Sequence, residues 1–156
     1  MRAWPLLIAL PLLAGCKNET ASLQFSGPDN ALTVQLRQAW FWSQEAEVEV
    51  VMVRQPECHR RSRLDSVALA EVNVEVLRPD EGVFAEPILI LKQGASLYAI
   101  STQNCEMQRF KAPPEKTGTR LGAFRLEGEK LKFFSAPAPK PAAQTAPASP
   151  ALSQSQ

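Results

Sequence analysis

The chain has 156 residues, with 17 Lys and Arg against 16 Asp and Glu, and a formal net charge of +1. This balance excludes the domain-wide basic footprint of a nucleic-acid-binding protein, so any electrostatic binding has to come from a local patch. The hydrophobic content of 45% is ordinary for a globular domain. The length allows one domain with a single core.

The N-terminus carries the most specific motif of the chain. A positive charge at Arg2 precedes an apolar stretch from Ala3 to Gly15, which ends in Leu13-Ala14-Gly15-Cys16. A membrane-spanning helix needs about 20 apolar residues, so a cleaved signal fits this short stretch better. The last four residues resemble the lipobox of a bacterial lipoprotein precursor. An ordinary secretory signal with Cys16 at the cut is the alternative.

The resemblance implies that residues 1–15 are a signal peptide, that Cys16 receives a diacylglycerol thioether and that its new amino group is acylated, for example with palmitate. Several lipid chains anchor a protein stably, whereas one chain binds only marginally. Lys17 follows the cysteine, and by resemblance this implies the outer membrane, with the protein facing the periplasm. Loss of Arg2 leaves the mature chain with a net charge of about zero.

Beyond a lipidated N-terminus and short linker at residues 16–21, we expect a β domain over residues 22–135. Apolar and polar residues alternate in several segments, which is typical of half-buried strands. The continuous apolar run at residues 88–91 predicts a strand buried on both faces. The expected strands lie at residues 32–36, 45–53, 68–76, 88–91, 97–100, 121–126 and 131–134.

Turn signals separate these segments. Gln93-Gly94 and Glu127-Gly128-Glu129 predict hairpins, and no window predicts a long amphipathic helix. We therefore expect an all-β fold, a small antiparallel sandwich or barrel of about seven or eight short strands.

The remaining two cysteines, Cys58 and Cys105, form an even pair in an exported chain. Compartments outside the cytoplasm are oxidising, so we predict that they form a disulfide. Each cysteine falls just past an expected strand, so the bond would tie two loops together at one end of the sheet. Closing a loop of this length stabilises the fold by about 4 kcal/mol in the chain-entropy model.

Four arginines lie close to Cys58, namely Arg54, Arg60, Arg61 and Arg63. Guanidinium groups suit phosphate and carboxylate, so a loop carrying them is a candidate anion-binding site. The alternative is that these arginines pair with glutamates of neighbouring strands, namely Glu45, Glu47, Glu49 and Glu71.

Aromatic residues concentrate at Trp40-Phe41-Trp42. On a strand, Trp40 and Trp42 would share one face, and we expect large aromatic side chains there to pack in the core. The alternative is an aromatic surface for stacking on sugar or for anchoring at an interface.

Catalysis has little support in the sequence, and we expect no enzyme. His59 is the only histidine, and Ser62 and Asp65 lie near it in sequence, but nearness along a loop is not the geometry of a triad. Without a second close cysteine, His59 and Cys58 do not complete a metal site. We expect neither a metal nor a cofactor.

From Ala136 onward the chain is rich in alanine and proline. Residues 136–156 contain one charged residue, Lys140, and no aromatic residue. Such a segment buries too little apolar surface to offset its ordering entropy, so we predict a disordered tail. It is either a featureless terminus or a spacer toward the cell wall or a partner.

The sequence thus predicts a non-enzymatic, lipid-anchored protein of the bacterial envelope that binds or supports another envelope component, a protein or an anionic group. A small ligand-binding or enzyme-inhibitor module at the envelope is the alternative. No nucleic acid is expected as a partner.

Overall fold

The computed structural model describes residues 17–40 and 42–137, and in this part of the chain it has eleven β-strands and one short 3-10 segment. The strands alternate with turns and short loops, and all their pairings are antiparallel. Their bounds are β1 Lys17–Gln24, β2 Asn30–Gln38, β3 Glu45–Arg54, β4 Cys58–Arg63, β5 Val67–Ala68, η1 Leu69–Glu71, β6 Asn73–Arg78, β7 Ile88–Gln93, β8 Ser96–Ser101, β9 Met107–Arg109, β10 Thr119–Glu127 and β11 Lys130–Ser135.

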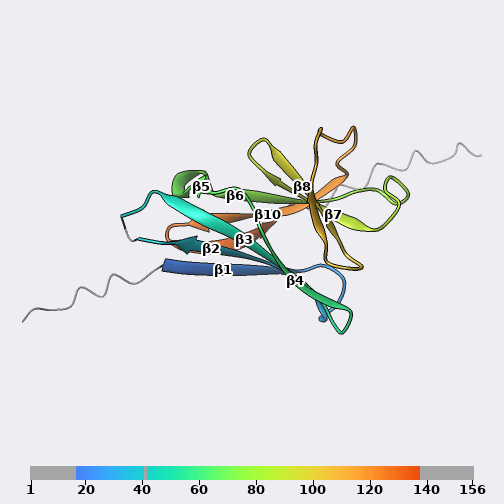
Figure 1. Ribbon diagram of the computed structural model, residues 1–156, viewed down its shortest axis with the longest axis horizontal. Coiled ribbons are helices and arrows are strands. Elements are labelled where there is room, and N and C mark those ends of the chain that lie inside the picture. Colours follow the sequence, from blue (N-terminus) through green and yellow to red (C-terminus); the bar gives the residue numbers. More distant parts are fainter. Residues whose placement is uncertain (1–16, 41, 138–156) are drawn as a thin grey trace, which may run out of the picture.

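Two sheets make up the fold. The first sheet has the order β1-β2-β3-β4, with β5 also paired to β3, and the second sheet has the order β11-β10-β6-β7-β8-β9. In Figure 1, β1 and β2 of the first sheet lie below β6 and β10 of the second. The prediction of an all-β antiparallel fold is confirmed, although the chain divides into more strands than expected.

The core lies between the two sheets and follows from the alternation in the sequence. Leu32, Val34 and Leu36 of β2 point inward, while the polar residues between them face out. The second sheet contributes Val74 and Val76 of β6 in the same way. The remaining fully buried side chains of this core include Val48, Val50, Met52, Leu89, Leu91, Ile100 and Phe124.

Strand β7 is buried on both faces, as its continuous apolar run predicted. Leu89 and Leu91 face the main core, whereas Ile88 and Ile90 belong to a second, smaller apolar cluster. That cluster includes Phe84 from the long loop after β6 and Phe110 from the segment after β9. The outer face of the second sheet is therefore covered in part by its own loops.

The strand expected over residues 68–76 is interrupted. Val67 and Ala68 pair with β3 in the first sheet, whereas β6 joins the second sheet at Asn73. The chain has to change layer between them, and the 3-10 turn Leu69–Glu71 makes that corner. Ala68 and Ala70 extend the alternation of β6 in composition only, since Ala70 is exposed and Val67 is the residue of β5 that packs on the core. The sequence pattern therefore does not reveal the break.

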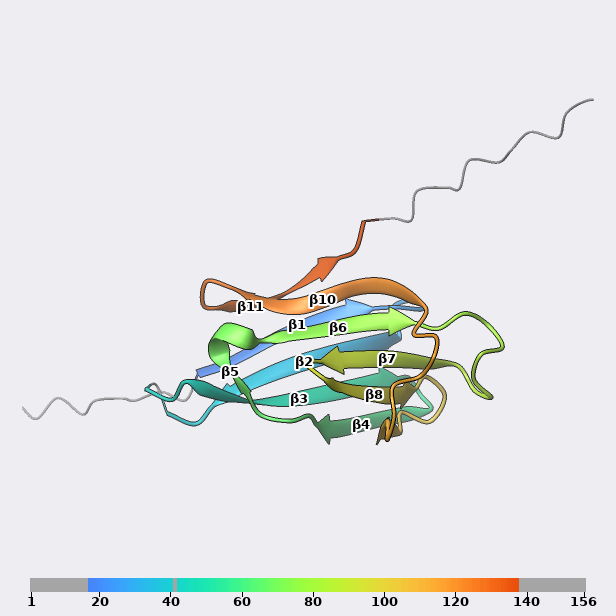
Figure 2. The same cartoon turned by 90° about the horizontal axis from the view of Figure 1, so that it is seen from above.

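The sandwich has two distinct ends. At one end, called here the β1 end, β1 begins opposite Gln38 of β2, and the β2–β3 loop, η1 and the β10–β11 turn lie nearby. The opposite end is called the disulfide end because the bond between Cys58 and Cys105 lies there, beside the β3–β4 turn, the long β6–β7 loop and the β8–β9 turn. Figure 2 shows the same division from above, with β11 running toward the disulfide end.

The domain starts earlier than the sequence pattern suggested. β1 begins at Lys17, so residues 17–21 are a strand and not the expected linker. The sequence pattern did not reveal β1 because most of its residues are polar. β1 is an outer strand, and its inward side meets only the edge of the core. Cys16 and the expected signal peptide lie outside the described residues, as do residues 138–156 of the expected tail. At the start of the tail, the Ala136 N–H donates to the Leu121 carbonyl at 2.8 Å.

Candidate interaction surfaces

The predicted disulfide between Cys58 and Cys105 is present, with a Cα–Cα distance of 6.0 Å. Its placement differs from the prediction. Cys58 is the first residue of β4 in the first sheet, and Cys105 lies in the β8–β9 turn of the second. The bond therefore links the two sheets along one side of the sandwich, and not two loops of one sheet.

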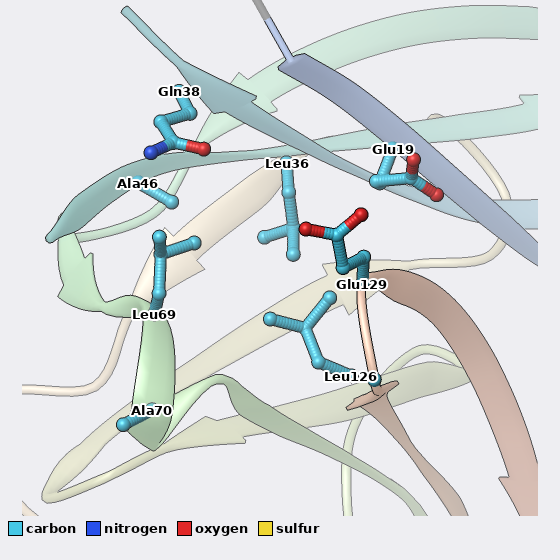
Figure 3. Close-up of a pocket in the computed structure, with 9 residues that line it drawn as sticks. Glu19, Leu36, Gln38, Ala46, Leu69, Ala70, Leu126 and Glu129 are labelled. Atoms are coloured by element: carbon cyan, nitrogen blue, oxygen red, sulfur yellow. The ribbon is translucent and has the colours of Figure 1, made fainter. Parts of the chain in front are cut away.

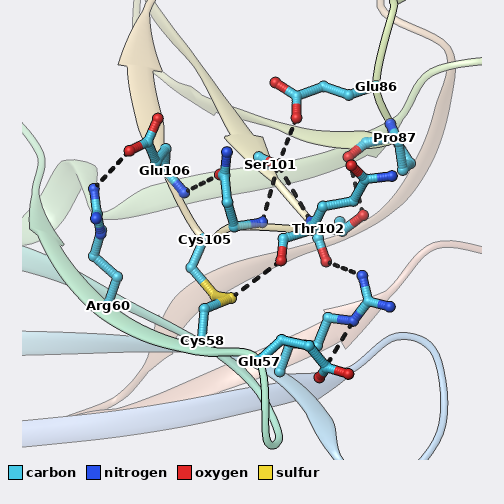
Figure 4. The surroundings of a disulfide bond; sticks show 12 residues. Glu57, Cys58, Arg60, Glu86, Pro87, Ser101, Thr102, Cys105 and Glu106 are labelled. Atoms are coloured by element: carbon cyan, nitrogen blue, oxygen red, sulfur yellow. Dashed lines mark hydrogen bonds and ion pairs between the residues drawn. A yellow bond between two sulfur atoms is a disulfide. The ribbon is translucent and has the colours of Figure 1, made fainter.

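Polar contacts surround this bond (Figure 4). The Arg60 Nη1 atom lies 3.2 Å from Glu106 Oε1, and Arg54 Nη1 donates to the Thr102 carbonyl at 3.0 Å. Thr102 Oγ1 donates to the Pro87 carbonyl at 2.9 Å. The β8–β9 turn is thus connected both to the first sheet and to the segment before β7, which braces the disulfide end.

The arginine segment is not a loop, contrary to the sequence interpretation, because Cys58–Arg63 form the edge strand β4. Arg61 and Arg63 face outward and each lies 3.2 Å from the carboxylate of Glu49 on β3. Glu49 and Arg63 are directly opposite in the register, so this is a cross-strand pair. Charges on an edge strand also discourage pairing with other sheets.

The other two arginines have acidic partners outside the expected set. Arg60 faces the core side and reaches Glu106, while Arg54 Nε lies 3.7 Å from Glu57 Oε2. The guanidinium-bearing side chains of β4 remain more than half exposed despite their ion pairs. The four arginines therefore divide between two faces and do not converge on one anion.

His59 and Ser62 do not form a catalytic pair. They are three positions apart on β4, so they lie on opposite faces of the strand. Ser62 is opposite the buried Val50, whereas His59 is opposite Val53 on the outer side. Asp65 lies beyond the end of β4 and has other partners.

Asp65 belongs to a polar network with β8 and β9. Ser96 Oγ donates to Asp65 Oδ2 at 2.9 Å, and Arg109 Nη1 lies 3.3 Å from the same carboxylate. The hydrogen bonds from Ser96 and Tyr98, with the charge of Arg109, hold the pKa of Asp65 below its ordinary value of 3.8. Burial and the neighbouring Asp65 raise the pKa of Tyr98. A carboxylate with a lowered pKa is a poor general base at neutral pH. The contacts of Asp65 with Ser96 and Arg109 tie the segment after β4 to the second sheet.

The two tryptophans are exposed, so the expectation of core packing is wrong. β2 ends at Gln38, and Trp40 and Trp42 lie in the β2–β3 loop with 56% and 59% of their surface exposed. Their rings stack with centroids 5.2 Å apart and planes 14° from parallel. Phe41 lies outside the described residues. The pair forms an exposed aromatic surface, as in the alternative interpretation.

A pocket of about 410 Å³ opens at the β1 end, close to this loop. Figure 3 shows Leu36, Leu69 and Leu126 around it, with the carboxylates of Glu19 and Glu129. The sequence analysis missed this pocket, since its walls come from β1, β2, β3, η1 and the β10–β11 hairpin. No local pattern marks residues that meet only after both sheets have formed.

A second cleft, of about 670 Å³, lies at the disulfide end. Phe25, Phe84 and Ile88 contribute apolar surface, while Arg78 and Glu86 supply charges of both signs. Arg78 Nη2 also donates to the Phe25 carbonyl at 2.9 Å, which joins the two sheets at this end.

Within residues 17–40 and 42–137, no group of His, Cys, Asp and Glu side chains is arranged to hold a metal ion. The same described ranges contain no helix that is long and apolar enough to cross a membrane. Comparison with protein-family models, with curated proteins and with solved structures found no match. The function therefore has to be inferred from the sequence and the geometry of the chain itself.

Proposed function

We propose that this chain is a lipid-anchored protein of the bacterial envelope, without catalytic activity, which docks another envelope component. The observation that carries the proposal is the position of Cys16. The lipobox cysteine stands directly before β1, so acyl chains at Cys16 would attach the sandwich to the bilayer with almost no intervening chain.

The disulfide supports export. A bond between Cys58 and Cys105 forms and persists in an oxidising compartment, such as the bacterial periplasm, and is rare in the cytosol. It links the two sheets, so the domain would reach full stability only after leaving the cytoplasm.

The opposite positions of the two ends support docking at a distance from the membrane. With Cys16 in the bilayer, the disulfide end points away from it. This end carries the larger cleft and the exposed Val83, with 41% of its surface accessible. Apolar surface rimmed by charges of both signs is typical of a protein-binding site.

The anchor is tested by replacing Cys16 with Ser and fractionating the cells. Because the lipobox cut depends on Cys16, residues 1–15 of this variant are exchanged for an ordinary cleavable signal, so that the Cys16→Ser protein is still processed and lacks Trp4. We expect the wild-type protein in the membrane fraction, with a mature N-terminus whose mass includes the acyl groups. The Cys16→Ser protein should be soluble and still contain the Cys58–Cys105 bond, which shows that it is folded. A Cys16→Ser protein that stays in the membrane fraction would contradict lipid anchoring.

The variant Lys17→Asp tests the choice of membrane independently. We expect it to move the protein from the outer to the inner membrane on a density gradient. Unchanged sorting would show that Lys17 does not determine the destination, and would leave the anchor itself intact.

Docking is tested by photocrosslinking in living cells. A photoreactive residue at position 83 should crosslink to a protein partner, whereas one at Gln35, on the outer face of β2, is the control position. Crosslinks at neither position, or only at position 35, would contradict docking at the disulfide end.

The pocket at the β1 end favours a second candidate, a small ligand-binding or enzyme-inhibitor module. Its leucine side chains suit an apolar ligand, and the Glu19 carboxylate, which lies 3.1 Å from Lys130 Nζ, can accept a further hydrogen bond from a donor on that ligand. Filling it with Leu126→Trp should abolish such binding while leaving crosslinking at position 83 unchanged.

A further inference from the structure

We infer that Trp40 and Trp42, in the β2–β3 loop, rest in the headgroup layer of the membrane and fix the orientation of the sandwich. This inference depends on the proposed lipid attachment of Cys16. The occupant that covers the loop is then the lipid surface to which the chain is anchored.

The first observation is the exposure of the loop. Trp40, Trp42 and Val83 are the large hydrophobic side chains with high exposure in the described part of the chain. The two tryptophans stack on each other, so they present one continuous apolar surface. Tryptophan is enriched where a protein meets the membrane interface, because its ring is apolar and its N–H is polar.

The second observation is that hydrogen bonds hold the described residues of the loop in place. The Ser43 N–H donates to the Trp40 carbonyl at 2.9 Å, and Gln38 Nε2 donates to the Ser43 carbonyl at 2.7 Å. Ser43 Oγ in turn accepts from the Glu45 N–H at 3.2 Å. Because these bonds already fix Trp40 and Ser43 relative to Gln38, the described part of the loop loses little entropy when it meets a surface.

The third observation is the distance from the anchor. Lys17 pairs with Gln38, and Trp40 is two residues further along. Paired Cα atoms are about 5 Å apart and each residue spans at most about 3.6 Å, so Trp40 lies within about 16 Å of Cys16. With the acyl chains of Cys16 in the hydrocarbon core, the loop cannot move far from the headgroups.

The fourth observation is the charge of the loop. Residues 38–44 contain no charged side chain, in a chain with 21% charged residues. The nearby carboxylate of Glu19 is paired with a cation, since Lys130 Nζ lies 3.1 Å from Glu19 Oε1. The tryptophan pair therefore offers the bilayer an apolar contact without a charge of its own.

Tryptophan fluorescence tests the inference cleanly. The chain has three tryptophans, of which Trp4 lies in the signal, so the mature protein reports only on Trp40 and Trp42. The lipidated protein is placed in phosphatidylcholine vesicles. We expect a blue shift, quenching by lipids brominated near the headgroup, and iodide quenching several-fold weaker than for the lipid-free Cys16→Ser protein.

Two variants serve as controls. A long Gly/Ser linker inserted between Cys16 and Lys17 keeps the anchor but frees the domain, so we expect most of the protection from iodide to be lost. Val83→Ser removes an exposed apolar side chain at the opposite end and should leave the protection of Trp40 and Trp42 from iodide unchanged. Trp40→Ser and Trp42→Ser, each with one tryptophan left, show which ring lies deeper.

The outcomes separate this inference from the proposed function. If Cys16 is not acylated and the protein does not bind vesicles, the proposed anchor fails. If the lipidated protein binds vesicles but its tryptophans remain as accessible to iodide as in the Cys16→Ser protein, the inference is wrong and the anchor stands. Equal quenching with and without the linker would also overturn it.

Discussion

Removing the disulfide is the most informative test of how the sandwich is held together. Cys58 and Cys105 are separated by 47 positions, and closing a loop of that size lowers the entropy of the unfolded chain enough to stabilise the fold by about 4 kcal/mol. For a domain of this size, about 4 °C of melting temperature corresponds to each kcal/mol. We therefore expect the melting temperature to fall by about 16 °C on reduction.

The assay compares oxidised and reduced protein in the soluble Cys16→Ser background by thermal unfolding and by urea. Reduction removes only the covalent bond, whereas Cys58→Ala with Cys105→Ala also removes two sulfur atoms. Since Cys105 is only 1% exposed, the double variant should be slightly less stable than the reduced protein.

The reasoning also predicts a change in the denatured state. Without the cross-link the unfolded chain is more extended, so the dependence of the free energy of unfolding on urea concentration should become steeper. A loss of less than about 4 °C on reduction would refute the entropic account. It would mean that contacts such as Arg60–Glu106 hold the sheets together without help from the bond.

Three further predictions follow from the ion pairs, the tail and the polar network. The double variant Arg61→Gln with Arg63→Gln should lower the free energy of unfolding by about 1–3 kcal/mol, more than the loss of an exposed ion pair would. The reason is that the Glu49 side chain is only 12% exposed and would lose both partners. Adding Glu49→Gln should restore most of this free energy, as measured by urea titration. Deleting residues 138–156 should change the melting temperature by less than about 2 °C, and a larger loss would mean that the tail docks on the domain. Since the pKa of Asp65 is lowered on folding, its contribution to stability is present above the ordinary value of 3.8 and is lost as pH falls through the folded pKa. Asp65→Asn should therefore weaken the fall in the free energy of unfolding at acid pH. An unchanged acid dependence would contradict this.

Much of the fold could be predicted because a strand with one buried face alternates apolar and polar residues. Leu32, Val34 and Leu36 alternate with polar residues, and the structure buries those three. The run at Ile88–Leu91 identified a strand covered on both faces for the same physical reason. Strand β1 escaped detection because most of its inward side meets the edge of the core.

The candidate sites were less predictable, since exposure depends on where a strand ends. Trp40 and Trp42 fit a buried strand by composition, yet β2 stops at Gln38 and the pair lies outside the core. The sequence analysis placed Arg61 and Arg63 on a loop beside a disulfide, but both lie on an edge strand, where Arg63 is directly opposite Glu49.

By itself, the sequence determined the all-β class, the inward-facing residues of the central strands and the pairing of Cys58 with Cys105. These depend on local periodicity and on a count of cysteines. Only the tertiary structure decided that the disulfide links two sheets, that the chain changes layer at Leu69–Glu71, and that Trp40 lies at the end where β1 begins. These features arise from contacts between residues far apart in the chain. The free energy of each contact depends on both partners, so a local sequence pattern cannot predict it.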